Sequence, residues 1–172
     1  MRRVAEYSKL LASKLGLSYY EVENIKIAAT MHDLGKLMIQ PDILEKPGKL
    51  TAEEYEIVKE HSKYGWDILA KSGGDIIEMA RLIALQHHER WNGKGYPDGI
   101  KGDDISIYAQ IVAVADVFDA LSSKRCYKEA WSVEEAKVEI FTQRGEQFAP
   151  DVVDVFLDSF DEFLEIKQQY GE

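Results

Sequence analysis

Helical spacing of apolar residues runs through almost the whole chain and limits its fold more than any other feature. Apolar side chains recur every three or four residues at Val4, Tyr7, Leu11 and Leu15, which is the spacing of one face of an α-helix. No segment of any length alternates apolar and polar residues as a half-buried β-strand does. The sequence therefore predicts an all-α fold.

Capping boxes and glycine or proline breaks divide this pattern into helices. Ser18, Thr51 and Ser132 are each followed three residues later by Glu, and this pattern is typical of a helix N-terminus. We expect one helical-bundle domain of about seven helices. The predicted helices cover residues 4–15, 18–33, 51–71, 76–89 and 107–121, a segment that begins at 132, and residues 150–170. Residues 91–105 contain four glycines and one proline and are expected to form a long loop.

Charge and cysteine content exclude several classes of partner. The chain of 172 residues has a formal net charge of −10, so it repels nucleic-acid polymers and anionic membrane surfaces. Its single cysteine, Cys126, rules out an intrachain disulfide and suits a reducing compartment. No apolar run approaches the ~20 residues that span a bilayer, and no signal peptide opens the chain. We expect a cytoplasmic protein with no membrane insertion of this segment.

All four histidines occur where a metal site would use them. His32 precedes Asp33 in HDLGK, His61 is alone on a predicted helix, and His87 and His88 are adjacent in HHE. Taken singly, a buried histidine is more often an ordinary core residue, and such doublets also occur by chance. The combination favours metal binding, because imidazole and carboxylate are ligands of divalent transition metals.

Asp116 is the most informative carboxylate, because it interrupts the apolar run AVADVFDAL. A carboxylate buried in such a helix is costly unless a cation or donor neutralises it. With Asp116 included, mixed nitrogen and oxygen ligands from four helices predict a site for two or more divalent metals, which would clamp the attacking and leaving oxygens of a phosphoester. The predicted ligands are His32, Asp33, His61, His87, His88 and Asp116. Iron or manganese suits a set without thiolates best, and zinc, nickel and cobalt are also compatible.

Cationic residues follow two of these motifs. Lys36 comes one helical turn after the HD doublet, and Arg125 and Lys128 follow Asp116. Such side chains can hold phosphate groups, Arg through two parallel hydrogen bonds and Lys as a point charge. The alternative interpretation is a solvated charged loop.

Read in order, these motifs resemble a known family. HDLGK, PDILEKPGKLT, HHERWNGKGYP and DVFDALSSKRCYK together resemble the HD-GYP subgroup of the HD phosphohydrolases. The resemblance implies an HD-domain helical bundle that hydrolyses cyclic di-GMP to pGpG, and in many members onward to GMP. It implies metal ligation by the six residues named above and catalytic roles for Asp33 and Lys36. It also implies substrate binding by Lys36, Arg125, Lys128 and the loop residues Gly95, Tyr96 and Pro97. The same loop is expected to dock diguanylate cyclase domains.

The resemblance covers residues 1–172, which we interpret as one HD-GYP-like phosphohydrolase domain. Family members carry an acidic residue and a histidine just before the position of Arg3. We therefore expect this chain to be a fragment that lacks the start of its first helix and an upstream sensor or receiver domain.

Two other functions remain open at this level. One is an inactive module that senses a cyclic dinucleotide or docks partners without cleaving. The other is a phosphohydrolase of a different nucleotide, because the motifs specify metal chemistry better than base identity.

Overall fold

The computed structural model describes residues 1–123 and 130–171. This part of the chain is helical and contains no β-strand, only an isolated bridge between Arg144 and Phe148. Its α-helices are α1 (Arg2–Lys14), α2 (Tyr19–Ala28), α3 (Pro41–Leu44), α4 (Ala52–Lys59), α5 (His61–Leu69), α6 (Asp75–Gln86), α7 (Ile107–Ser122), α8 (Val133–Thr142), α9 (Pro150–Asp158) and α10 (Phe160–Gln169). Three short 3-10 helices are η1 (Ala29–Met31), η2 (Leu34–Met38) and η3 (Gly102–Asp104). The predicted all-α fold is confirmed.

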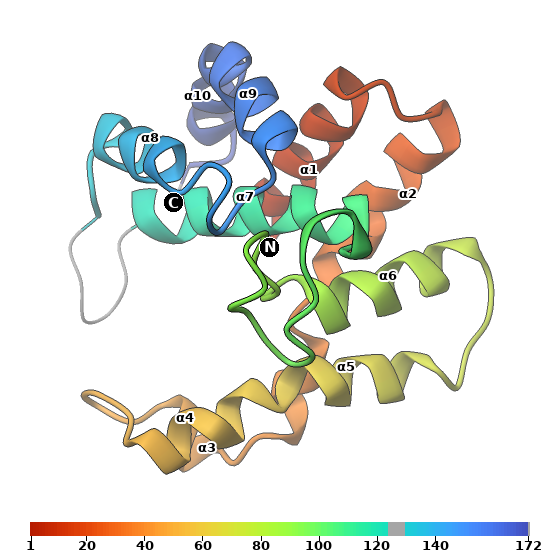
Figure 1. Ribbon diagram of the computed structural model, residues 1–172, viewed down its shortest axis with the longest axis vertical. Coiled ribbons are helices and arrows are strands. Elements are labelled where there is room, and N and C mark those ends of the chain that lie inside the picture. The colour runs from red at the N-terminus through yellow and green to blue at the C-terminus, as the bar shows by residue number, and fades with distance from the viewer. Residues whose placement is uncertain (124–129, 172) are drawn as a thin grey trace.

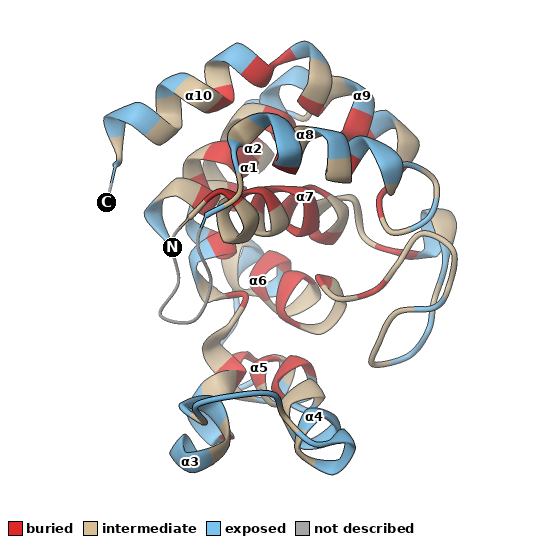
Figure 2. Ribbon diagram, turned by 90° about the vertical axis from the view of Figure 1, so that its left-hand side faces the viewer, coloured by how far each residue is buried: buried red, intermediate tan, exposed pale blue. Residues whose placement is uncertain are grey.

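Helix α7 forms the centre of the bundle, with α8 to α10 on one side and α5 and α6 on the other (Figures 1 and 2). Helices α1, α6, α8 and α9 all pack against it. Its residues Ile111, Val114 and Phe118 are fully buried, as expected of a central helix made mostly of apolar residues. No helix of the described residues is long and apolar enough to cross a membrane.

The three predicted capping boxes are present at the starts of α2, α4 and α8. In each, the hydroxyl oxygen of Ser18, Thr51 or Ser132 accepts from the backbone N–H three residues later, and the Glu there accepts from the capping residue's own N–H. Each box satisfies two backbone donors that the helix itself leaves unpaired. The Ser/Thr-x-x-Glu pattern in the sequence therefore predicts the starts of these three helices correctly.

Two helices predicted as continuous are broken. The helix over residues 51–71 divides at Glu60 into α4 and α5, and the helix over 150–170 divides at Ser159 into α9 and α10. Neither break has a glycine or proline. Burial explains both: α4 buries no residue while α5 begins with buried His61, and the second break lets Phe160 and Phe163 reach the core.

Close backbone packing sets the position of η2 on α5. A Cβ atom on Gly35 would lie 1.9 Å from the carbonyl oxygen of His61 and 2.5 Å from the nitrogen of Gly65. Only glycine allows this approach. The HDLGK segment is thereby held directly against the first turn of α5, which brings Asp33 towards His61.

Candidate metal centre

The predicted ligands come from four segments that meet between α5 and α7. His32 and Asp33 lie in the turn between η1 and η2, and His61 is the first residue of α5. His87 and His88 follow the last residue of α6, and Asp116 lies in the middle of α7. The helix predicted over 76–89 therefore ends at Gln86, which leaves the histidine pair in the turn after it.

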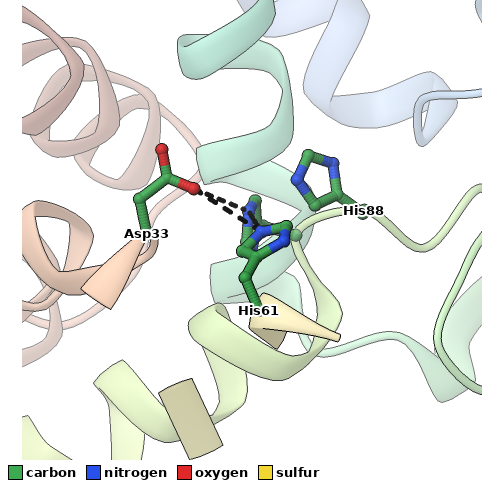
Figure 3. Close-up of side chains that lie close together, drawn as sticks. Asp33, His61 and His88 are labelled. Atoms are coloured by element: carbon green, nitrogen blue, oxygen red, sulfur yellow. Dashed lines mark hydrogen bonds and ion pairs between the residues drawn. The ribbon is translucent and has the colours of Figure 1, made fainter. Parts of the chain in front are cut away.

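Asp33 lies at the centre of the site. Its Oδ1 is 3.5 Å from Nε2 of His61 and 3.8 Å from Nε2 of His87. One ligand atom from each of Asp33, His61, His87 and His88 lies within 4.8 Å of all the others. Figure 3 shows the side chains of Asp33, His61 and His88 converging on one space. This group can offer three nitrogens and one oxygen to a cation.

The other oxygen of Asp33 faces a second set of groups. Its Oδ2 is 3.4 Å from Nε2 of His32, and the same nitrogen is 3.6 Å from Oδ1 of Asp116. All six predicted residues are therefore brought together, with Asp33 shared between two sets. A carboxylate placed in this way can bridge two cations, one on each oxygen.

Backbone carbonyls orient three of the imidazoles. Nδ1 of His32 donates to the carbonyl of Ala29 at 2.7 Å, and Nδ1 of His61 donates to that of Val58 at 2.6 Å. Nδ1 of His87 donates to Ile83 at 2.9 Å. A proton fixed on Nδ1 leaves the lone pair of Nε2 directed into the site, as metal-ligating histidines require.

Burial and nearby charge set the protonation states of the candidate ligands. Burial lowers the pKa values of His61, His87 and His88, so these imidazoles are neutral at pH 7. Burial also opposes charge on His32, but the nearby carboxylates of Asp116 and Asp33 outweigh it and raise the pKa of His32 to about 10. The Asp33 pKa is lowered, because hydrogen bonding and charge from His32 and Lys36 together outweigh burial. The positive charge of protonated His32 offsets part of the negative charge of Asp33 and Asp116.

The cationic residue Lys36 is close to the cluster. Its Nζ is 2.7 Å from Oδ2 of Asp33, and its side chain is 41% exposed. Lys36 is therefore within reach of both the cluster and a ligand from solvent. The predictions for Arg125 and Lys128 concern positions outside the described residues.

The loop of residues 91–105, here called the GYP loop after Gly95, Tyr96 and Pro97, folds back onto the histidine pair. The ring of Tyr96 stacks on that of His88, with centroids 4.7 Å apart, and the Tyr96 N–H donates to the His88 carbonyl at 3.2 Å. A Cβ on Gly95 would lie 2.4 Å from the nitrogen of Arg90, so glycine is required there. Pro97 continues the loop through a cis peptide bond with Tyr96. The loop thus forms one wall of the site.

Glu89, which the sequence did not single out, anchors this loop. It is 3% exposed, and its Oε1 accepts from the backbone N–H of Asp98 at 2.8 Å and of Gly99 at 3.1 Å. Burial raises its pKa. The sequence did contain a clue to this role. Glu89 lies between the HH pair and a glycine-rich loop, and the backbone N–H groups of such a loop need acceptors.

Comparison with known proteins agrees with this geometry. Residues 1–152 match the family model described as HD domain. The chain is 45% identical over 167 residues to 3'3'-cGAMP-specific phosphodiesterase 2 of Vibrio cholerae, covering 97% of this chain and 32% of the relative. It is 48% identical over 157 residues to the cyclic di-GMP phosphodiesterase response regulator RpfG of Xanthomonas campestris, covering 91% of this chain and 42% of the relative. The chain thus spans between a third and just over two fifths of the length of these relatives.

The fold also matches a solved structure. An HDG"Y"P protein from Bdellovibrio bacteriovorus superposes with a TM-score of 0.70 at 22% identity, over 93% of this chain and 51% of that one. The shared bundle, the family model and the HD, HHE and GYP motifs agree. This chain belongs to the HD domain family and, within it, to the HD-GYP subgroup.

Proposed function

We propose that this chain is the catalytic unit of a phosphodiesterase that hydrolyses cyclic di-GMP to pGpG and then to GMP. The observation that carries the proposal is the shared position of Asp33, with one oxygen facing His61 and His87 and the other facing His32. That donor set suits two divalent cations, with iron or manganese favoured because it has no thiolate. When bound, such cations neutralise phosphate charge and acidify a water molecule.

The residues of the chain supply binding and orientation. The carbonyls of Ala29, Val58 and Ile83 fix the three imidazoles, so the ligands need little rearrangement as a substrate arrives. Lys36 holds a substrate phosphate by its positive charge, and Tyr96 closes the side of the site next to His88. Arg125 and Lys128 are proposed to hold the second phosphate.

The wider assignment is also a proposal. We infer that the full protein carries a sensor or receiver domain before residue 1, since the named relatives are much longer than this chain. The exposed part of the GYP loop, including Lys94 and Asp98, is the surface we propose for docking diguanylate cyclase domains. We place the protein in the cytoplasm, in keeping with its single Cys126.

A second substrate, 3'3'-cGAMP, is favoured by the 45% identity to a phosphodiesterase named for it. Both dinucleotides present the same phosphodiester chemistry to the metal centre. They differ in one base, so the two candidates are separated by direct competition.

The test is hydrolysis by anaerobically purified protein loaded with Fe(II) or Mn(II), with products resolved by chromatography. We expect pGpG and GMP from cyclic di-GMP, and we expect chelator to abolish the formation of both products. Asp33→Asn should lower the rate of hydrolysis at least a hundredfold, about the effect of removing one electrostatic contact to the transition state. Asp42→Asn on α3, an exposed carboxylate with no contact to the site, is the matched control. Binding without turnover would identify a sensor module, and full turnover by Asp33→Asn would refute the proposed centre.

A further inference from the structure

Helix α4 brings a lysine and a tyrosine to the edge of the metal centre. Nζ of Lys59 lies 5.5 Å from the ring centroid of Tyr96 and 5.6 Å from that of Tyr55. The two rings are 6.5 Å apart and nearly perpendicular. An ammonium group within ~6 Å of a ring centroid is attracted to the ring face, so the two tyrosines hold Lys59 in place. In Figure 1, the green loop after α6 descends below α7 towards the yellow helices α4 and α5.

We propose that Tyr55, Lys59 and Tyr96, here called the α4 ledge, recognise one base of the cyclic dinucleotide and select guanine over adenine. This inference rests on the proposed function. The ledge begins one ring away from the ligand cluster, because Tyr96 stacks on His88 at 4.7 Å. In a nucleotide, one sugar separates the base from the phosphate. A dinucleotide whose phosphate lies at the ligand cluster can therefore place a base on the α4 ledge.

The chemistry of Lys59 favours guanine. Its ammonium group carries three donors and no acceptor. Guanine presents two acceptors, N7 and O6, on one edge, whereas adenine presents N7 beside the N6 amino donor. A lysine on that edge therefore gains a hydrogen bond with guanine and meets a competing donor with adenine.

The surroundings of Lys59 leave it available to a ligand. Its only ion pair in the described residues is with Glu56, which is 67% exposed, and such exposed pairs contribute little. Tyr55 is 49% exposed, so its ring can stack on a base of either kind. Helix α4 buries no residue, and substitutions on it therefore leave the core unchanged.

The test compares cyclic di-GMP with cyclic di-AMP on the full chain. Relative kcat/KM is measured in metal-loaded protein, and relative binding is measured by calorimetry in chelator, where no turnover occurs. We expect Lys59→Ala to lower the preference for cyclic di-GMP about tenfold, through KM rather than kcat, as loss of a base-edge contact would. Lys59→Arg should retain the preference. Tyr55→Leu should weaken both ligands about equally, since stacking does not distinguish bases.

Lys63→Ala is the matched control, because Lys63 is an exposed lysine on α5 without aromatic contacts among the residues that the structure describes. The inference would be overturned by an unchanged preference in Lys59→Ala or by an equal change in Lys63→Ala. It would also be overturned if the wild-type protein does not favour cyclic di-GMP over cyclic di-AMP, or if it binds neither dinucleotide. If the protein binds cyclic di-GMP selectively through Lys59 but does not hydrolyse it, the proposed function is refuted and the role of the α4 ledge in base recognition is supported.

Discussion

Glu89 shows how one side chain can position a whole loop. Its carboxylate accepts two backbone N–H groups from residues 98 and 99, directly after the GYP motif, while its own backbone follows His88. The segment that carries the GYP motif is thus joined to the turn of the histidine pair by the chain before the motif and by hydrogen bonds just after it. Tyr96 then has little freedom to leave the ring of His88.

Replacing Glu89 tests this attachment. Glu89→Ala leaves the N–H groups of Asp98 and Gly99 without their acceptor, and we expect the free energy of unfolding to fall by about 2 kcal/mol. Hydrolysis should fall as well, because Tyr96 is no longer held. The measurements are urea unfolding and kcat/KM on the same preparation.

Glu146→Ala is the control for this change. Glu146 is exposed and accepts from the side chain of Asn92 in the same loop, so its loss should change stability by less than about 0.5 kcal/mol. If the two substitutions lower stability equally, the hydrogen bonds that Glu89 accepts from Asp98 and Gly99 do not anchor the loop.

At the scale of elements, the sequence located helix starts better than helix breaks. A capping box such as Ser18 with Glu21 is local, because both partners lie within one turn. The breaks at Glu60 and Ser159 depend on what each half of the helix packs against, and that information lies in distant segments.

The same distinction applies to the candidate site. The six metal-ligand candidates could be named from residue type and motif, and the structure brings them together. The two oxygens of Asp33 also suggest from the sequence that it could be shared between two metals. Its distances to His61, His87 and His32 could not be predicted, because they depend on the packing of η2 on α5. The sequence did not indicate a role for Tyr55 or Lys59, because the pattern of α4 is that of an ordinary exposed helix, and the proximity of Lys59 to Tyr96 is a tertiary contact.

Helix α9 offers a prediction about an uncapped start. Its N-cap is Ala149, which makes no side-chain hydrogen bond. We expect Ala149→Ser to raise the free energy of unfolding by about 1 kcal/mol, because a hydroxyl can accept from a first-turn N–H. Thermal unfolding measures the change, with Ala149→Val as a control that adds bulk without an acceptor. A fall in stability with serine as large as with valine would contradict the capping argument.

At the scale of the whole molecule, the metal centre connects segments that are far apart in the chain. Residues from 32 to 116 contribute to it, and they come from the η1–η2 turn, α5, the end of α6, and α7. Helix α5 lies between the exposed α3–α4 region and α6, which packs on α7 (Figure 2). A cation bound there would therefore stabilise the packing of these segments on one another.

Metal binding should appear as thermal stability. A ligand that binds only the folded state stabilises it by about 2.7 kcal/mol at a hundredfold excess over its Kd. For a chain of this size that corresponds to a rise in Tm of about 5–10 °C. We expect this rise when Mn(II) is added anaerobically to metal-free protein, and we expect chelator to reverse it.

Two variants show whether the rise comes from the centre described here. Asp33→Asn removes the carboxylate shared by both ligand sets and should abolish most of the increase in Tm. Asp42→Asn removes an exposed carboxylate on α3 and should preserve the increase, and sodium chloride at matched ionic strength should produce none. An undiminished rise in Asp33→Asn would mean that the stabilising cation binds elsewhere, because no other carboxylate of the described residues faces both His61 and His32 at these distances.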